Sequence, residues 1–187
     1  MKKILSLLII CLIVSCSQNR YHVNEITKPT DGLYYLKNDM SLVNGIVYNE
    51  FGDVGLFTNG IKNGIHKEWY ENGQLKLKLS YKNGKLDGLL REWYENGQLR
   101  TKGYGKNGKP SGIYKSWYEN GQLSNEGNFK NGEKDGLHKT WFDNAQLLSE
   151  TNYIKGKING LLRIWHPNGQ LSVEGNFKNG EKDGLHK

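Results

Sequence analysis

Glu68–Leu75 reads EWYENGQL, and the same eight letters return at Glu92–Leu99. A variant of the phrase, SWYENGQL, occupies Ser116–Leu123. Its tryptophan recurs every 24 residues, at Trp69, Trp93, Trp117, Trp141 and Trp165. A fixed period of this length is typical of an array of short structural units, each of which contacts mainly its neighbours.

This period divides most of the chain into equal units. They are Gly64–Asp87, Gly88–Ser111, Gly112–Asp135, Gly136–Asn159 and Gly160–Asp183, and a partial sixth begins at Gly184. Gly32-Leu33-Tyr34-Tyr35 and Gly45-Ile46-Val47-Tyr48 echo the units without keeping their spacing. We therefore predict a cap of degenerate repeats over residues 31–63, and five full repeats with a partial sixth over residues 64–187.

Each unit contains two predicted turns, and most of these turns carry Asn-Gly. The first set is Asn72-Gly73, Asn96-Gly97, Asn120-Gly121 and Asn168-Gly169, with Asn144-Ala145 as the exception. The second set is Asn83-Gly84, Asn107-Gly108, Asn131-Gly132 and Asn179-Gly180, with Lys155-Gly156 in the fourth unit. Asn-Gly suits the two-residue type I′ turn, in which both central residues need positive φ. The aromatic and aliphatic segments between the turns favour strands. The pattern predicts an all-β fold, an elongated antiparallel β-meander or solenoid of 24-residue β-hairpin repeats.

The predicted turns also fix which side chains lie opposite each other. A two-residue loop at the first set pairs Lys115 with Glu126, Lys139 with Glu150 and Arg163 with Glu174. Opposite charges in such positions stabilise a sheet. The same register places Tyr118 beside Leu123 and puts the tryptophans on the opposite face, with Leu89, Leu137 and Leu161. A β-bulge near the second turn would change this assignment.

The beginning of the chain combines a basic start, an apolar run and a cysteine. Lys2 and Lys3 precede an apolar run, Ile4–Val14, which is too short to span a bilayer but suits a signal peptide. Ile13-Val14-Ser15-Cys16 resembles a lipobox, in which the cysteine becomes the lipidated first residue. We predict a signal peptide over residues 1–15 and a lipidated tether over 16–30. A plain secretory signal and an uncleaved apolar anchor are the alternatives.

The repeated phrase resembles a known family. From Gly64 to Lys187, the Trp-aromatic-x-Asn-Gly phrase, the second turn and the period together resemble the bacterial variant of the MORN repeat, found in YwqK-type antitoxin-like proteins. The resemblance implies a stack of β-hairpins that contacts proteins or membrane lipid, and an antitoxin role. Ala145, His166-Pro167 and Gly105 depart from the pattern.

The candidate sites follow from residues at repeated positions. Trp69, Trp93, Trp117, Trp141 and Trp165 form a candidate binding stripe, with packing as the alternative role. His66, His138 and His186 share one repeat position, which argues against a metal site because other units hold different residues there: Leu90, Tyr114 and Leu162. Asp87, Asp135 and Asp183 are expected to brace turns. We find no catalytic constellation, and processing at Cys16 would leave no free thiol. We therefore predict a protein that is not an enzyme and needs no cofactor or metal.

Together these features predict a membrane-anchored envelope lipoprotein whose array is a protein-interaction scaffold. The alternatives are an antitoxin or immunity protein that neutralises a toxin, and an envelope glycan- or lipid-binding module. The formal net charge of +7 arises from interleaved basic and acidic residues, so we expect no nucleic-acid partner. A final strand that lacks its neighbour leaves an open sheet edge, where self-association is expected.

Overall fold

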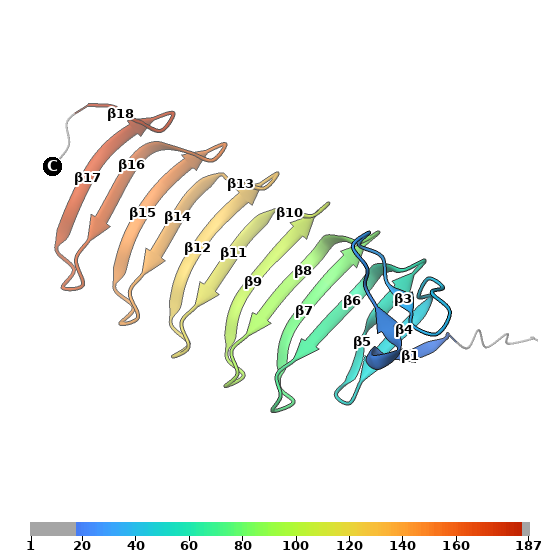
Figure 1. Ribbon diagram of the computed structural model, residues 1–187. Helices are drawn as coiled ribbons and strands as arrows, with labels where there is room; N and C mark the ends of the chain where they lie inside the picture. Colours follow the sequence, from blue (N-terminus) through green and yellow to red (C-terminus); the bar gives the residue numbers. More distant parts are fainter. Residues whose placement is uncertain (1–17, 185–187) are drawn as a thin grey trace, which may run out of the picture.

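The computed structural model describes residues 18–184 as one long, open sheet with a small structure packed on its N-terminal end (Figure 1). Sixteen strands of this region form the sheet, in the order β1-β4-β5-β6-β7-β8-β9-β11-β12-β14-β15-β16-β17-β18, with β10 beside β9 and β13 beside β12. Only β1 joins in parallel, beside β4, and the other pairs are antiparallel. The predicted all-β meander of hairpins is confirmed.

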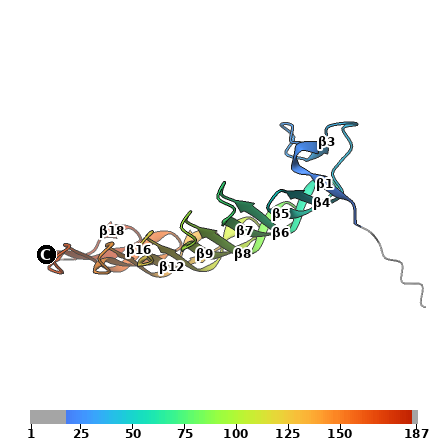
Figure 2. The same ribbon diagram turned by 90° about the horizontal axis from the view of Figure 1, so that it is seen from below.

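Each repeat contributes two long strands, and the turn between repeats sometimes adds a short one. The strands of the array are β6 Ile61–Trp69, β7 Leu75–Lys82, β8 Lys85–Trp93, β9 Leu99–Lys106, β10 Lys109–Pro110, β11 Gly112–Trp117, β12 Leu123–Lys130, β13 Glu133–Lys134, β14 Gly136–Trp141, β15 Leu147–Ile154, β16 Lys157–Trp165, β17 Leu171–Lys178 and β18 Glu181–Lys182. Seen along its edge, the array is a single thin layer (Figure 2). Both faces of most strands are therefore open to other molecules.

The turns of the second set have the predicted type I′ geometry. Asn83 has φ of 51° and Gly84 has φ of 74°, and Lys82 pairs with Lys85 across this two-residue loop. Asparagine tolerates positive φ better than most residues, and glycine adopts it without steric cost. The same geometry recurs at the other members of this set, including Lys155-Gly156.

The turns of the first set differ from the prediction. Gly73 has φ of 81°, but Asn72 is not among the residues with positive φ. The Gly73 N–H donates to the Tyr70 carbonyl at 3.0 Å, and the Tyr70 N–H donates to the Gln74 carbonyl at 2.9 Å. This is a three-residue loop, a type I turn closed by a glycine in the left-handed region. The Asn72 side chain explains the difference, because its oxygen accepts the Gln74 N–H at 2.9 Å and holds the turn locally.

The longer loop is accompanied by a β-bulge, and the pairing predicted next to the loop is wrong for this reason. The register shifts between Ser116 and Trp117, so that Leu123 lies opposite Trp117 and not opposite Tyr118. Away from the bulge the predicted register is confirmed, and Lys115 lies opposite Glu126. The three predicted charge pairs form ion pairs: Lys115–Glu126 at 3.2 Å, Lys139–Glu150 at 2.9 Å and Arg163–Glu174 at 2.7 Å.

The face opposite the tryptophans is packed by alternating large and small residues. His66 lies between Gly55 and Leu79 across the sheet, and its ring occupies the space that a Cβ at Gly55 would need. His138 covers Gly127 in the same way. The histidine rings continue into edge-to-face contacts with strand-end aromatics, such as His66 with Tyr81 at 5.2 Å between ring centroids. Glycine on one strand thus makes room for a ring on the next.

The buried core lies at the N-terminal end and consists of Val43, Val47 and Phe57. The main sheet there is built from β1 Arg20–His22, β4 Gly45–Asn49 and β5 Gly52–Thr58. The short 3-10 helix η1 Val23–Glu25 and a second sheet, formed by β2 Ile26–Thr27 and β3 Tyr35–Leu36, complete this region. Tyr34 packs on Phe57, with ring centroids 4.7 Å apart. One end of the array is therefore covered by a small hydrophobic core.

Several predictions concern residues outside the described range. The signal peptide over 1–15 and the lipidated Cys16 lie there, as does His186. At the C-terminal end of the described region, β18 pairs with β17 at Phe177 and Lys178. Self-association through the sheet edge stays a prediction.

Ala145 holds the position of the loop glycine, and its φ of 67° is unfavourable for any residue with a Cβ. We expect Ala145→Gly to raise the free energy of unfolding by about 0.5–1 kcal/mol, because relief of this strain exceeds the added entropy of the unfolded chain. Urea denaturation measures the change.

Gly169 provides the matched control, because it occupies the same loop position with φ of 82° and a Cβ there meets no atom within 4 Å. Gly169→Ala should lower the free energy of unfolding by about the same amount, 0.5–1 kcal/mol. Equal stability of Gly169→Ala and the wild type would contradict this account of the loop.

Candidate binding surface

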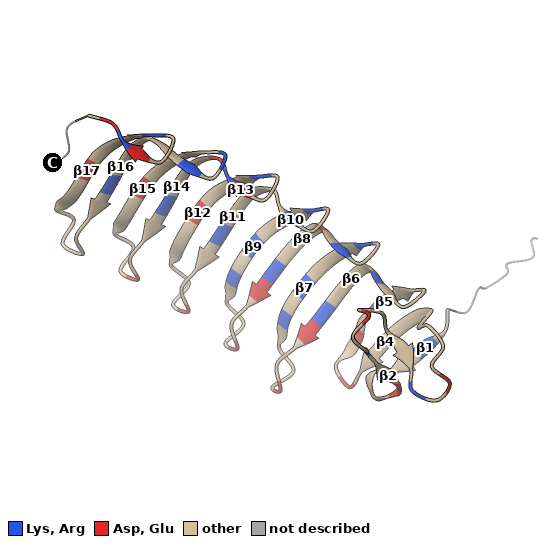
Figure 3. Cartoon of the chain, turned by 45° about the horizontal axis from the view of Figure 1, so that its top comes forward, with Lys and Arg blue, Asp and Glu red and all other residues tan. Residues whose placement is uncertain are grey.

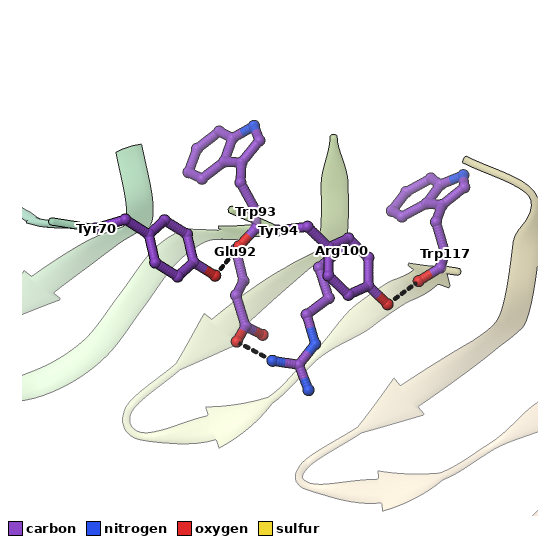
Figure 4. Close-up of polar contacts among 6 residues, drawn as sticks. All are labelled: Tyr70, Glu92, Trp93, Tyr94, Arg100 and Trp117. Carbon is purple, nitrogen blue, oxygen red and sulfur yellow. Dashed lines mark hydrogen bonds and ion pairs between the residues drawn. The ribbon is translucent and has the colours of Figure 1, made fainter. Parts of the chain in front are cut away.

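The tryptophans lie on one face of the array, here called the Trp face. In each unit the strand that ends in tryptophan alternates its side chains, so residues two and four positions earlier share the face of the tryptophan. Figure 4 shows Trp93 and Trp117 pointing to one side of the sheet, while Glu92 and Arg100 point to the other and form an ion pair at 2.9 Å. The Trp face therefore also carries a charged row and an aliphatic row.

All five predicted stripe residues are half-buried, namely Trp69, Trp93, Trp117, Trp141 and Trp165. Trp69 packs near Phe51, with ring centroids 6.3 Å apart. Part of each ring therefore contributes to packing, and part remains accessible.

The aliphatic row is more exposed than the tryptophans. Ile65, Leu89 and Ile113 have 50%, 48% and 53% of their surface accessible, and Leu137 and Leu161 continue the row. They occupy one position in successive repeats, so they form a line along the array instead of scattered single residues. Sequence reasoning placed leucines on this face but did not single out the row as a candidate site.

The repeated tyrosine and asparagine join neighbouring repeats. The Tyr70 hydroxyl donates to the Trp93 carbonyl at 2.7 Å, and Tyr94 bonds to Trp117 in the same way at 2.8 Å (Figure 4). Tyr118 bonds to the Trp141 carbonyl at 2.7 Å. The side-chain amide of Asn72 reaches the Glu95 carbonyl at 3.2 Å. This constant offset of 23 residues shows that Tyr and Asn of the repeated phrase hold the scaffold together.

The shared histidine position is structural. His66 and His138 are only 4% and 6% exposed, and their Nε2 atoms lie 2.8 Å from the carbonyl oxygens of Leu56 and Asn128. Burial lowers the pKa of both rings, which favours the neutral form. Among residues 18–184, no group of three or more His, Cys, Asp or Glu side chains could hold a metal ion. The same region contains no helix long and apolar enough to span a membrane.

Asp87 braces a turn, although not its own. Its carboxylate accepts the Asn107 N–H at 3.2 Å, in the type I′ turn of the next repeat. Asp135 and Asp183 lie at the corresponding position, where their backbone N–H groups donate to Asn128 and Asn176. These contacts again connect strands and turns without forming a chemical site.

Comparison with known proteins finds a repeat family that is similar to part of the array. Four segments match the family model described as the MORN repeat variant, over residues 62–83, 86–107, 110–131 and 158–179. The intervening stretch, which contains Phe142 and Ala145, is not among the matched segments. A search of curated proteins finds no match to the chain. The matched repeat is a non-catalytic module associated with interactions.

The tyrosine bonds generate a paired prediction. We expect Tyr94→Phe to lower the free energy of unfolding by about 1 kcal/mol, because the Trp117 carbonyl loses its hydroxyl partner. Phe142 stands where the next tyrosine of the series would be, so Phe142→Tyr should add up to about 1 kcal/mol by bonding to the Trp165 carbonyl.

Thermal and urea unfolding of both variants measure these changes. Circular dichroism in the far ultraviolet serves as the control that the strands are retained. A stability loss in both variants would show that the bond between repeats is not what the tyrosine contributes.

Proposed function

Since four of its segments match the MORN repeat variant, we propose that this chain is a protein-interaction scaffold in the envelope of a bacterium, anchored to a membrane by lipid on Cys16. The array is the binding part and the Trp face is its main contact surface. The N-terminal region connects the array to the anchor.

One observation carries the interaction role, the line of exposed aliphatic side chains at a repeated position of the Trp face. Ile65, Leu89 and Ile113 lie beside half-buried tryptophans on the same face. Contiguous exposed apolar surface is uncommon on proteins that bind nothing, and it marks sites of association. Aromatic residues at such sites contribute strongly to binding energy.

The shape of the array also supports a scaffold. Sixteen strands in one open layer give a long surface for its mass (Figure 2). Each repeat presents the same tryptophan and aliphatic positions, so a partner can contact several units at once. Catalysis needs a few converging groups in a concave site, whereas binding along a line needs only repetition.

Chemical crosslinking of the full chain in envelope extract tests the interaction role. We expect a specific protein to be recovered with the wild type and lost with the double variant Leu89→Ser and Ile113→Ser. Ile154→Ser is the matched control, because Ile154 is also exposed, at 49%, but ends β15 next to a type I′ turn. Equal recovery by all three forms contradicts the proposal, as does retention of the chain by purified envelope polysaccharide alone.

The anchor has its own test, substitution of Cys16 by alanine. We expect Cys16→Ala to abolish incorporation of radiolabelled palmitate and to change processing of the chain. Unchanged processing, with the variant still in the membrane fraction, would show that the lipoprotein proposal is wrong. The interaction role does not depend on this result, because the crosslinking experiment tests it.

A further inference from the structure

A row of five basic residues crosses the Trp face in the N-terminal half of the array. Each lies directly opposite the next in the sheet register: Lys67 opposite Lys78, Lys78 opposite Arg91, Arg91 opposite Lys102, and Lys102 opposite Lys115. We call Lys67, Lys78, Arg91, Lys102 and Lys115 the basic row. Figure 3 shows blue bands of Lys and Arg on the neighbouring strands from β6 to β11.

The same row changes character at β12. From Lys115 onward it alternates in sign, through Glu126, Lys139, Glu150, Arg163 and Glu174. Ion pairs join these residues along the row, with Arg163 also 3.9 Å from Glu150. Among the described residues, Lys67, Lys78, Arg91 and Lys102 take part in no ion pair.

This contrast is informative because the two halves have the same fold. Like charges directly opposite each other destabilise a sheet, and opposite charges stabilise it. The C-terminal half shows that this backbone accommodates the stabilising arrangement. The N-terminal half instead keeps four successive like-charge pairs, so its positive charge is available to a ligand.

The surroundings of the basic row provide apolar contacts as well. A hollow of about 300 Å³ is lined by Lys102 and Lys115 together with Leu89, Tyr104 and Ile113. A second hollow, of about 290 Å³, contains Lys67, Lys78 and Ile65. Asp53 also lines the second hollow, but it forms an ion pair with Arg20.

We propose that the basic row and the two hollows bind an acidic polypeptide segment that also carries apolar side chains. The segment lies along the array, with its carboxylates on the row and its apolar side chains in the hollows. This inference rests on the proposed interaction role and specifies the chemistry of the partner.

A polypeptide fits these features better than a membrane surface does. The exposed aliphatic row continues over Leu137 and Leu161, whereas the run of basic residues ends at Lys115, which forms an ion pair with Glu126. A bilayer would favour charge along the whole aliphatic row, while a short segment needs it only over its own length. Strands about 4.8 Å apart make the basic row roughly 19 Å long, which an extended peptide of about six residues covers.

Charge reversal within the basic row tests the inference without disrupting the fold. Lys78→Glu combined with Lys102→Glu reproduces the alternating signs of the C-terminal half. We expect the double variant to melt at a higher temperature than the wild type and to bind an acidic peptide at least about tenfold more weakly at 0.15 M salt. Improved stability with lost binding excludes unfolding as the cause.

The probe is a fluorescein-labelled peptide of about twelve residues, composed of glutamate and leucine and long enough to cover the row about twice. Fluorescence anisotropy with the full chain in nonionic detergent measures its affinity. A peptide with lysine in place of glutamate is the charge control. The matched gain-of-charge variant, Glu126→Lys with Glu150→Lys, should bind the acidic peptide more tightly than the wild type while losing stability.

Three results of the peptide and nanodisc measurements would overturn the inference. They are equal affinity of the wild type and the Lys78→Glu/Lys102→Glu variant for the acidic peptide, no binding of that peptide at all, and a difference between the two forms on phosphatidylglycerol nanodiscs but not on the peptide. The last result would assign the row to a membrane surface. A crosslinked partner recovered equally by both forms would also refute the basic row as its site, while leaving the interaction role intact.

Discussion

Alternation of two hairpin loops is the constraint on which the rest of this structure depends. Beyond the two-residue loops the register shifts by two residues, as between Leu79 and Tyr81, and this shift brings Lys78 opposite Arg91. Each three-residue loop adds an unpaired residue, such as Arg100, opposite Glu92 and Trp93. The bulge of the three-residue loop falls beside the tryptophan, and the shift that follows the two-residue loop falls near the strand-end tyrosine, such as Tyr81. Both lie outside the charged positions, which stay opposite one another across the sheet. The loops therefore determine which side chains share a face, and the faces determine what the array can bind.

Much of this order could be predicted from sequence, because it depends on local chemistry. Asn83-Gly84 specified its turn, and the pairing of Lys115 with Glu126 followed from loop length. The first turn was misassigned because Asn72 forms a bond from its own side chain, and the dipeptide Asn-Gly alone does not distinguish the two loops. The hydrogen bond from Tyr70 to Trp93 depends on the distance between successive hairpins, and a local sequence pattern does not predict that distance. The loop-length rule also pairs Lys67 with Lys78, but the continuous basic row depends on the register shift that brings Lys78 opposite Arg91, which the turn dipeptides do not specify.

The two halves of the array use one backbone for different balances of stability and recognition. In the C-terminal half, the charges along the shared row satisfy one another. In the N-terminal half, repulsion across the row is offset by other contacts, among them the buried ring of His66 and the tyrosine bonds between repeats. This division resembles the balance at many binding sites, where local stability is lower so that a ligand can supply the missing contacts. In this array the lower local stability is spread over the five strands that carry the basic row.

The buried core at one end of the array has a consequence for how the chain folds. Val43, Val47 and Phe57 lie near the N-terminal end of the described region, and each later hairpin pairs only with its neighbours. Contacts of this kind are close in sequence, so no segment must wait for a distant one before it can pair. A chain delivered N-terminus first, from a ribosome or a translocation channel, can therefore add one hairpin at a time onto a finished template. The order in which the hairpins leave the ribosome or channel is then the order in which they can pair.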